Sequence, residues 1–275
     1  MTSISVFHCS DLHFGHPAVP EQYEAIESLI QESRFDVVII SGDLTQRARS
    51  GEFQRARAFI RHAERVSRVI VVPGNHDVAW WLSPFGFGDD EKLLSKYRRY
   101  ISAEIEPVLR APGATFVGLN TCHGVIRETL TWNLRDLSII GYLREDQLDR
   151  AAAELAKAPA GDARVIVMHH NPVKGELSRR HGLRNTNRIL GAFAEMGVDL
   201  VCCGHDHQEA VHYIEHTKKG TIISTAGTIS NRARGGRPSS VNSIRLTMKD
   251  IDVHTLVWSQ ELRRFGPGPQ RLFPR

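Results

Sequence analysis

The stretch that decides the fold is Val71-Val72-Pro73-Gly74-Asn75-His76-Asp77, in which a short apolar run stops at a Pro-Gly pair. An amide, an imidazole and a carboxylate follow this stop immediately. A buried strand that ends in such a turn predicts a sheet that holds polar side chains firmly at its edge. Ligands bind to open α/β sheets at the carboxyl ends of the strands. The stretch therefore indicates an α/β protein with a functional site at a strand end.

The segments before this stretch alternate between apolar runs and amphipathic spacing. The runs predict strands at 4–9, 36–40 and 69–72, and the spacing between them predicts helices at 21–32 and 52–64. This order of strand, helix and strand is typical of a parallel sheet with right-handed crossovers.

The second half of the chain continues the alternation and then changes. Further strands are expected at 115–119, 165–168 and 198–203, with helices at 144–156, at 185–195 and within 91–109. The last predicted strands have no helices between them, so this end of the chain is expected to be antiparallel. They lie at 210–214, 221–225, 243–247 and 251–258.

Composition limits the architecture and the partners. A length of 275 residues with 41% hydrophobic residues allows one sizeable core, so we expect a single domain over 1–260. Residues 261–275 are rich in Pro, Gly and Arg and are expected to form an irregular basic tail. The net charge of +4 suits an anionic substrate, and equally a solvated surface. Because the chain has no dense block of Lys and Arg, nucleic acid is not an expected partner.

Cysteine usage and the N-terminus indicate the compartment. Cys9, Cys122, Cys202 and Cys203 show no disulfide or zinc-knuckle spacing, and three of them lie in apolar runs that predict buried strand positions. No secretory signal is visible in the first residues, and no apolar run reaches the roughly 18 residues of a membrane span. We expect a cytoplasmic protein with reduced thiols and leave a homo-oligomer open.

Five predicted strand ends carry polar side chains of related chemistry. They are Asp11-Leu12-His13, Gly42-Asp43, Gly74-Asn75-His76-Asp77, His169-His170 and Gly204-His205-Asp206-His207. Carboxylate, amide and imidazole groups suit Mn²⁺, Fe, Zn²⁺ or Mg²⁺. Seven candidate ligands are too many for one tetrahedral ion and suit two ions that share a carboxylate. Two metals about 3.5–4 Å apart are a known device for phosphoester chemistry.

The order of these motifs resembles that of the calcineurin-like metallophosphoesterases. Within that superfamily the chain looks most like the bacterial class III cyclic-nucleotide phosphodiesterase and glycerophosphodiesterase group, over residues from about 4 to 227. The resemblance implies a four-layer α-β-β-α sandwich with two mixed β-sheets. It also implies two metal ions, with Mn, Fe or Zn expected, and attack on phosphorus by a hydroxide that bridges them.

The resemblance assigns a role to each motif. One metal would be held by Asp11, His13 and His207, and Asp43 would bridge it to the second. The second metal would be held by Asn75, His169 and His205. His76 would protonate the leaving oxygen or steady the phosphoryl charge, and Asp77 could orient His76 through its other ring nitrogen.

Two adjacent histidines compete for one of these places. The family often shows H-H-P-P, in which the first histidine is the ligand, but Asn171 stands here where the first proline would be. We assign His169 as the ligand and place His170 next to it. His8 has no motif context and is expected to be a surface or core residue.

Loops around the metal site are expected to determine which substrate binds. Arg232, Arg234 and Arg237 lie on a glycine-rich loop and could fork onto phosphate oxygens, although a solvated loop would look the same. Arg179, Arg180 and Arg184 form a second basic cluster. The aromatic stretch 80–90 could cover the site, contact another protomer or pack under its own loop.

The leading interpretation is a dinuclear metal phosphoesterase that hydrolyses small phosphodiesters, either cyclic nucleotides or glycerophosphodiesters. The alternatives are a phosphomonoesterase, a protein phosphatase or a nuclease on the same metals. A non-enzymatic scaffold is disfavoured because all seven candidate ligands are present.

Overall fold

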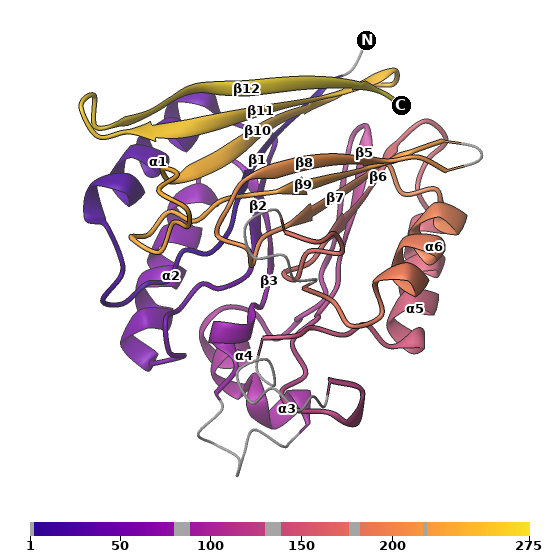
Figure 1. Ribbon diagram of the computed structural model, residues 1–275, viewed down its shortest axis with the longest axis horizontal. Helices are drawn as coiled ribbons and strands as arrows, with labels where there is room; N and C mark the ends of the chain where they lie inside the picture. The colour runs from indigo at the N-terminus through magenta and orange to yellow at the C-terminus, as the bar shows by residue number, and fades with distance from the viewer. Residues whose placement is uncertain (1–2, 80–88, 130–138, 176–181, 217–218) are drawn as a thin grey trace.

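The computed structural model describes residues 3–79, 89–129, 139–175, 182–216 and 219–275. Two six-stranded sheets face each other across a shared core, and helices cover their outer faces (Figure 1). In both sheets, some neighbouring strands run parallel and others run antiparallel. The predicted α/β sandwich with two mixed sheets is confirmed.

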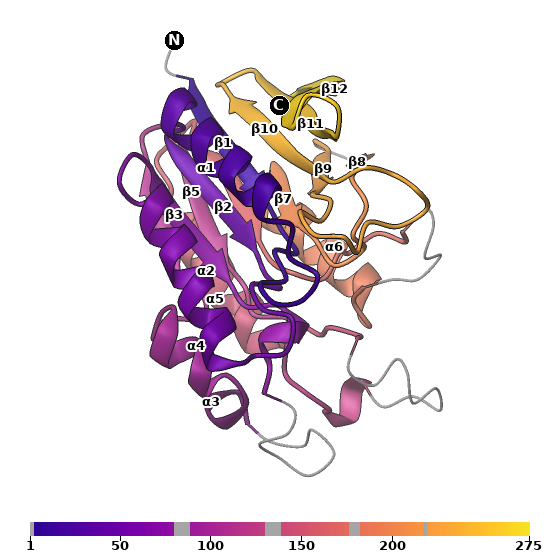
Figure 2. The same ribbon diagram turned by 90° about the vertical axis from the view of Figure 1, so that its left-hand side faces the viewer.

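The first sheet has the order β12-β11-β10-β1-β2-β3. Its strands are β1 (Ile4–Cys9), β2 (Val37–Ser41), β3 (Arg68–Val72), β10 (Ser240–Leu246), β11 (Asp250–Ser259) and β12 (Arg264–Pro274). β1, β2 and β3 run parallel to one another, as predicted, and are joined by α1 (Pro20–Ser33) and α2 (Ser50–Ala63). Figure 2 shows these two helices lying across the outer face of β1, β2 and β3.

The second sheet has the order β4-β5-β6-β7-β9-β8. Its strands are β4 (Val108–Ala111), β5 (Ala114–Gly118), β6 (Ala163–Val167), β7 (Leu200–Cys203), β8 (Ala210–Ile214) and β9 (Thr221–Thr225). Two helices, α5 (Glu145–Ala156) and α6 (Thr186–Met196), cover its outer face. The helix α6 is followed by Gly197, which adopts the left-handed conformation that commonly ends a helix.

Strand periodicity explains how the layers form. Along β1, Ile4 and Val6 belong to the core between the sheets, whereas Phe7 and Cys9 belong to the core under α1 and α2. Successive side chains on a strand point to opposite faces, so one nearly continuous apolar run can fill two cores at once. Cys9, Cys202 and Cys203 are buried, as expected from their apolar runs, and Cys122 is buried as well; all four are free.

The C-terminal residues differ from the prediction. Instead of an irregular tail, β12 pairs antiparallel with β11 from Arg264 to Pro274. Composition misled the prediction because β12 is an edge strand, and prolines are tolerated on the unpaired side of an edge or at a bulge. The register between the two strands shifts between His254 and Leu256.

The helix predicted within 91–109 is confirmed, but a strand at the end of this segment escaped prediction. Two short helices, α3 (Asp90–Leu93) and α4 (Ser95–Tyr100), are followed by β4, which the pattern did not reveal. β4 is a four-residue edge strand that is mostly only half-buried, so it lacks the apolar run that marks a central strand.

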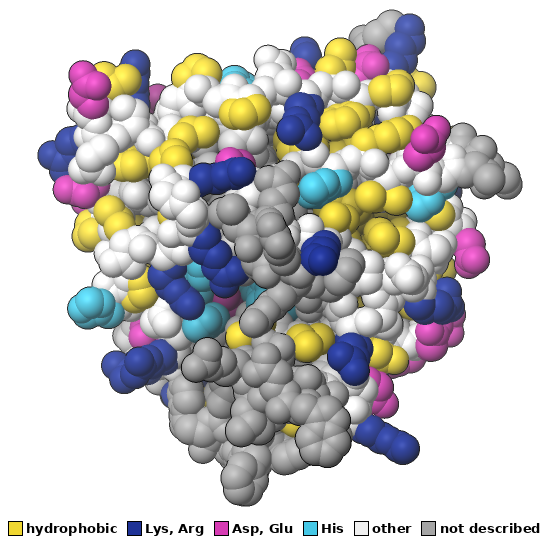
Figure 3. All heavy atoms as spheres, viewed as in Figure 1, with side chains coloured by type: hydrophobic (Ala, Val, Ile, Leu, Met, Phe, Trp, Pro, Cys, Tyr) yellow, Lys and Arg dark blue, Asp and Glu magenta, His cyan; other side chains and the backbone are white. Residues whose placement is uncertain are grey.

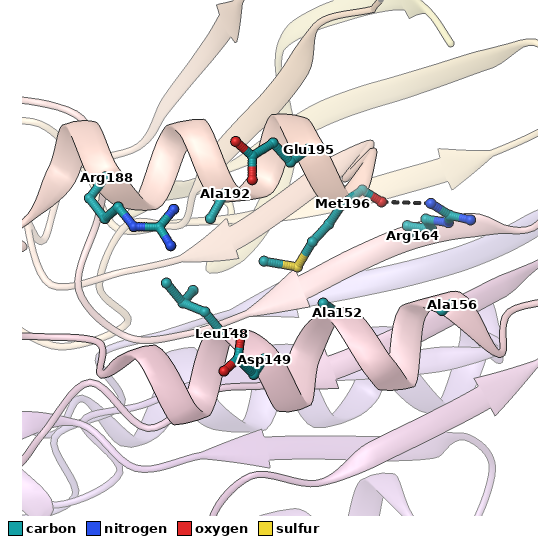
Figure 4. A pocket seen from close by; sticks show the side chains of 9 residues that line it. All are labelled: Leu148, Asp149, Ala152, Ala156, Arg164, Arg188, Ala192, Glu195 and Met196. Carbon is teal, nitrogen blue, oxygen red and sulfur yellow. Dashed lines mark hydrogen bonds between the residues drawn. The ribbon is translucent and has the colours of Figure 1, made fainter.

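A surface groove of about 340 Å³ lies between α5 and α6 (Figure 4). Leu148, Ala152 and Met196 line it together with charged residues such as Arg188 and Glu195. None of the predicted site residues lines this groove. Within the described residues, no helix has the length and apolar character needed to cross a membrane.

Candidate metal centre

The five polar motifs meet where strands of both sheets end. Asp11, Asp43 and Asn75 follow β1, β2 and β3 in the first sheet. His169 follows β6, and the pair His205 and His207 follows β7 in the second sheet. Because parallel strands end at the same edge, two sheets packed face to face bring residues from distant parts of the chain together. The predicted site is thus assembled across the two sheets.

Five of the seven predicted ligands have a left-handed backbone. The φ angles are 54° at Asp11, 48° at His13, 51° at Asp43, 75° at His205 and 54° at His207. Such conformations in residues other than glycine cost of order 1–3 kcal/mol each and cluster at functional sites. The turns therefore hold these side chains in place at the expense of backbone strain.

The first group of side chains is buried and tightly convergent. The Nε2 atoms of His13 and His207 lie 3.0 Å apart. The Oδ1 atom of Asp11 lies 3.1 Å from the Nε2 atom of His207 and 3.7 Å from that of His13. This oxygen accepts no hydrogen bond from any described residue, although it is buried. A buried carboxylate oxygen and two imidazole nitrogens that face one another fit a shared metal ion.

The second group lies beside the first. The Oδ1 atom of Asn75 is 3.1 Å from the Nε2 atom of His169 and 3.2 Å from the Nδ1 atom of His205. The Oδ1 atom of Asp43 lies 3.4 Å from the Nε2 atom of His169. Its Oδ2 atom lies 3.7 Å from the Nε2 atom of His13 in the first group. Asp43 thus presents one oxygen to each group, as a bridging ligand would.

Hydrogen bonds to the backbone orient the imidazoles. The Nδ1 atom of His169 lies 2.9 Å from the carbonyl oxygen of Ser41, and that of His207 lies 3.2 Å from the carbonyl oxygen of Arg232. A carbonyl only accepts, so each Nδ1 carries a proton, and in the neutral ring the Nε2 lone pair is directed toward the centre. The backbone N–H of His205 donates to Oδ2 of Asp11, which leaves Oδ1 for the centre.

The electrostatics of the centre favour cations. Burial opposes ionisation, but neighbouring histidines outweigh it and hold the pKa values of Asp11 and Asp43 well below their usual range. Burial lowers the pKa of His13 to about 4 and the pKa of His205 to about 3. Burial would also lower the pKa of His169, but the charge of Asp43 raises it to about 9. His169 must therefore release a proton to bind a metal, because histidine ligates in its neutral form.

The predicted partnership of Asp77 with His76 is wrong. The Nδ1 atom of His76 lies 2.8 Å from the carbonyl oxygen of Gln46, which therefore orients the ring. The carboxylate of Asp77 instead accepts hydrogen bonds from backbone N–H groups of Leu44, Thr45 and Gly74.

Asp77 therefore ties the turn after β2 to the turn after β3. The Thr45 hydroxyl adds a hydrogen bond of 2.8 Å to the same carboxylate. Burial and the charge of Asp43 raise the pKa of Asp77 to about 7, although these hydrogen bonds oppose the shift. The residue stabilises the two turns that carry Asp43 and Asn75, and its sequence position next to His76 did not reveal this.

His169 and His170 occupy different surroundings. His169 approaches Asp43 and Asn75, as described above, whereas the Nδ1 atom of His170 lies 2.7 Å from the hydroxyl of Thr121. The ring of His170 nevertheless lies 4.5 Å from the ring of His205, so the three histidines form one group, in which His205 is only partly buried. This geometry supports the choice of His169 as the ligand, with His170 next to it.

Of the three predicted arginines, Arg232 lies at the centre. Its Nη1 atom is 3.1 Å from the Nε2 atom of His76, 3.2 Å from Oε1 of Gln46 and 3.4 Å from Nδ1 of His13. Figure 3 shows histidine side chains at the surface next to a group of Lys and Arg side chains. A guanidinium at this place adds positive charge beside the candidate ligands.

The other two arginines face acidic side chains. Arg234 lies 4.0 Å from Asp206, and Arg237 lies 3.2 Å from Glu209. Arg184 is exposed, and Arg179 and Arg180 lie outside the described residues, as does most of the aromatic stretch.

At the end of that stretch, Asp90 forms a cluster that motif spacing could not reveal. Its carboxylate contacts the Nδ1 atom of His123 at 2.8 Å and Arg144 at 3.2 Å.

Fold and donor set together define a candidate dinuclear metalloenzyme. Comparison with known proteins then gives its family. The model of the calcineurin-like phosphoesterase family matches residues 4–209, and the chain belongs to this family of phosphoester hydrolases.

The relatives are distant. A probable cyclic nucleotide phosphodiesterase from Colwellia psychrerythraea is 22% identical over 200 residues, which cover 71% of this chain and 65% of that protein. The match thus spans slightly less than two thirds of the relative. A dimetal phosphatase from Danio rerio has a TM-score of 0.69 at 13% identity over 98% of both chains. A purple acid phosphatase from yellow lupin has a TM-score of 0.67 at 12% identity, covering 93% of this chain and 52% of that one. These structures share the fold.

Proposed function

We propose that this protein is a dinuclear metal-dependent phosphodiesterase that hydrolyses small phosphodiesters, such as cyclic nucleotides or glycerophosphodiesters. The observation that carries the proposal is Asp43, which presents one carboxylate oxygen to each of two groups of ligand atoms. The distant relative described as a probable cyclic nucleotide phosphodiesterase supports the diester preference.

The seven predicted side chains would hold the metals. The groups are Asp11, His13 and His207 for one ion, and Asn75, His169 and His205 for the other, with Asp43 shared. Bound ions would supply Lewis-acid stabilisation of phosphoryl charge and lower the pKa of water. The donors are carboxylate, amide and imidazole groups, which suit Mn, Fe or Zn, and cellular supply decides between such metals.

His76 is proposed to face the phosphoryl group. Its backbone N–H donates to Asp43 at 2.8 Å, and its Nδ1–H donates to Gln46, so its Nε2 atom is fixed beside the centre. There it can hold a proton shared with an oxygen of the substrate. A His76→Gln variant that turns over alkyl diesters at the wild-type rate would remove this role.

A turnover panel tests the function. Protein loaded with Mn²⁺ should hydrolyse bis(p-nitrophenyl) phosphate faster than p-nitrophenyl phosphate, and cyclic AMP or a glycerophosphodiester should be turned over at comparable efficiency. Single-stranded DNA serves as the nuclease comparison. A preference for the monoester would make this a phosphomonoesterase that uses the same centre, and the diester proposal would fail.

Arg232 is proposed to bind substrate phosphate, and its removal should weaken binding more than chemistry. Hydrogen bonds to charged groups contribute about 1.5–3 kcal/mol, so Arg232→Ala should raise the KM for a diester roughly tenfold or more. The bound metal content should change little, because His207 contacts the backbone carbonyl of Arg232, which the variant keeps. The side chain approaches the predicted ligand His13 only at 3.4 Å, which is longer than its contacts with His76 and Gln46.

The matched comparison is Arg237→Ala, which removes a cation from the same loop but one that pairs with Glu209. Its KM should change less than about twofold, since exposed ion pairs contribute little. Equal KM values for wild type and Arg232→Ala would show that Arg232 does not bind substrate and that the loop is only a solvated surface loop.

A further inference from the structure

The core between the two sheets changes from apolar to polar next to the metal centre. Side chains alternate along a strand, so His8 shares the inward face of Ile4 and Val6, and Ser41 shares that of Ile39. Neighbouring and facing strands change at the same level, and the buried polar residues of this layer include His8, Ser41, Asn242, Thr255 and Ser224. An apolar side chain at any of these places would continue the core.

His8 is enclosed completely within this layer. It has no exposed surface, and its Nε2 atom lies 2.9 Å from the hydroxyl oxygen of Ser41. Its Nδ1 atom has no hydrogen-bond partner among the described residues. Burial lowers the pKa of His8 to about 3, so the ring is neutral. A valine or leucine would fill this place without burying an unpaired nitrogen, so core packing alone does not explain a histidine.

Ser41 connects His8 to a predicted metal ligand. The carbonyl oxygen of Ser41 accepts hydrogen bonds from the Nδ1 atom of His169 at 2.9 Å and from the hydroxyl of Ser10 at 3.0 Å. The next residue, Gly42, has a φ of 92°, and a Cβ atom there would meet the ring of His169 at 2.6 Å. The turn after β2 therefore packs closely against His169, and the position of the Ser41 carbonyl oxygen sets the orientation of the His169 ring.

We propose that His8 is a positioning residue for the metal centre. By binding the hydroxyl of Ser41, it fixes the residue whose carbonyl oxygen receives the Nδ1–H of His169. His169 then keeps one tautomer, with its Nε2 lone pair directed toward Asp43 and Asn75. This inference rests on the proposed assignment of His169 as a metal ligand. Ser41 contacts the ligand directly, and loss of such a partner typically changes metal affinity or activity 10–100-fold. His8 acts on the ligand through Ser41.

Calorimetric titration of the metal-free protein with Mn²⁺ tests the proposal without any substrate. The wild type should bind two ions. His8→Leu should bind one ion with unchanged affinity and the other about 10–100-fold more weakly. His8→Gln should recover part of this loss, because an amide can still bond to the hydroxyl of Ser41.

The control is Thr115→Val, which also removes a buried polar group without a partner, at the start of β5 and far from its carboxyl end. Its affinity for both ions should equal that of the wild type. If His8→Leu does not fold, Ser41→Ala tests the inference instead, because it removes the same hydrogen bond and keeps the imidazole of His8. Ser41→Ala should likewise bind one of the two ions more weakly and the other with unchanged affinity.

Three results would overturn the inference. Wild-type affinity for both ions in His8→Leu or in Ser41→Ala would show that the hydrogen bond does not position His169. An equal loss at both ions, without recovery in His8→Gln, would indicate general damage to the core. A wild type that binds no Mn²⁺ would refute the proposed metal centre itself, and the inference with it.

Discussion

An Asp43→Asn variant is expected to lose one or both metal ions and more than about 100-fold in turnover. Loss of an outer-shell partner typically costs 10–100-fold, and a ligand shared by two ions should cost more. The substitution removes a buried negative charge and replaces one of the two oxygens that face the ligand groups. It leaves a donor next to the Nε2 atom of His13 or His169, where a metal would have to bind.

Metal content by mass spectrometry and turnover of bis(p-nitrophenyl) phosphate measure this effect. Asp199→Asn is the matched control, because Asp199 is also buried and ion-paired, with Lys219 and Arg275, at the opposite end of the second sheet. That variant should lose stability and keep its metals. Wild-type turnover in Asp43→Asn would refute the proposal that Asp43 bridges two metal ions needed for hydrolysis.

A Gly74→Ala variant is expected to be as inactive as Asp43→Asn, although it changes no ligand. A Cβ atom at Gly74 would lie 2.0 Å from the backbone nitrogen of Asp43 and 2.2 Å from its Oδ1 atom. Neither atom can move without displacing the carboxylate that both ligand groups share. Inserting a methyl group into such a packed place also destabilises a protein by about 1–3 kcal/mol.

Two effects of the substitution can be measured separately. Thermal unfolding reports the loss of stability, and metal content and diester turnover report the displaced carboxylate. Gly51→Ala is the control, because a Cβ atom there meets nothing within 4 Å and the residue lies in α2. Alanine in place of an exposed helical glycine should stabilise the protein by about 0.5–1 kcal/mol and leave turnover unchanged. Normal metal content and turnover in Gly74→Ala would contradict the close approach of the two turns.

Local patterns predicted much of the fold. The bounds of β1, β8 and β9 agree with the apolar runs, and the parallel order of β1, β2 and β3 follows from the helices between them. Two edge strands, β4 and β12, escaped prediction, whereas the edge strands β3 and β8 were predicted from their apolar runs. β4 carries no long apolar run, and β12 contains prolines that a central strand would exclude.

The amino-acid sequence by itself determined which chemical groups stand at the strand ends, because a polar motif directly after a buried strand can be read without knowing its neighbours. The seven predicted ligands of the metal centre belong to this class, and their role as ligands stays a prediction. Only the tertiary structure decided how they are supported. Asp77 clamps two turns instead of orienting His76, Arg232 rather than Arg234 reaches the centre, and His8 contacts Ser41. Apart from the bond between Gly74 and Asp77, such contacts join residues about 30 or more positions apart. Their partners depend on the packing of turns and sheets, which no local spacing encodes.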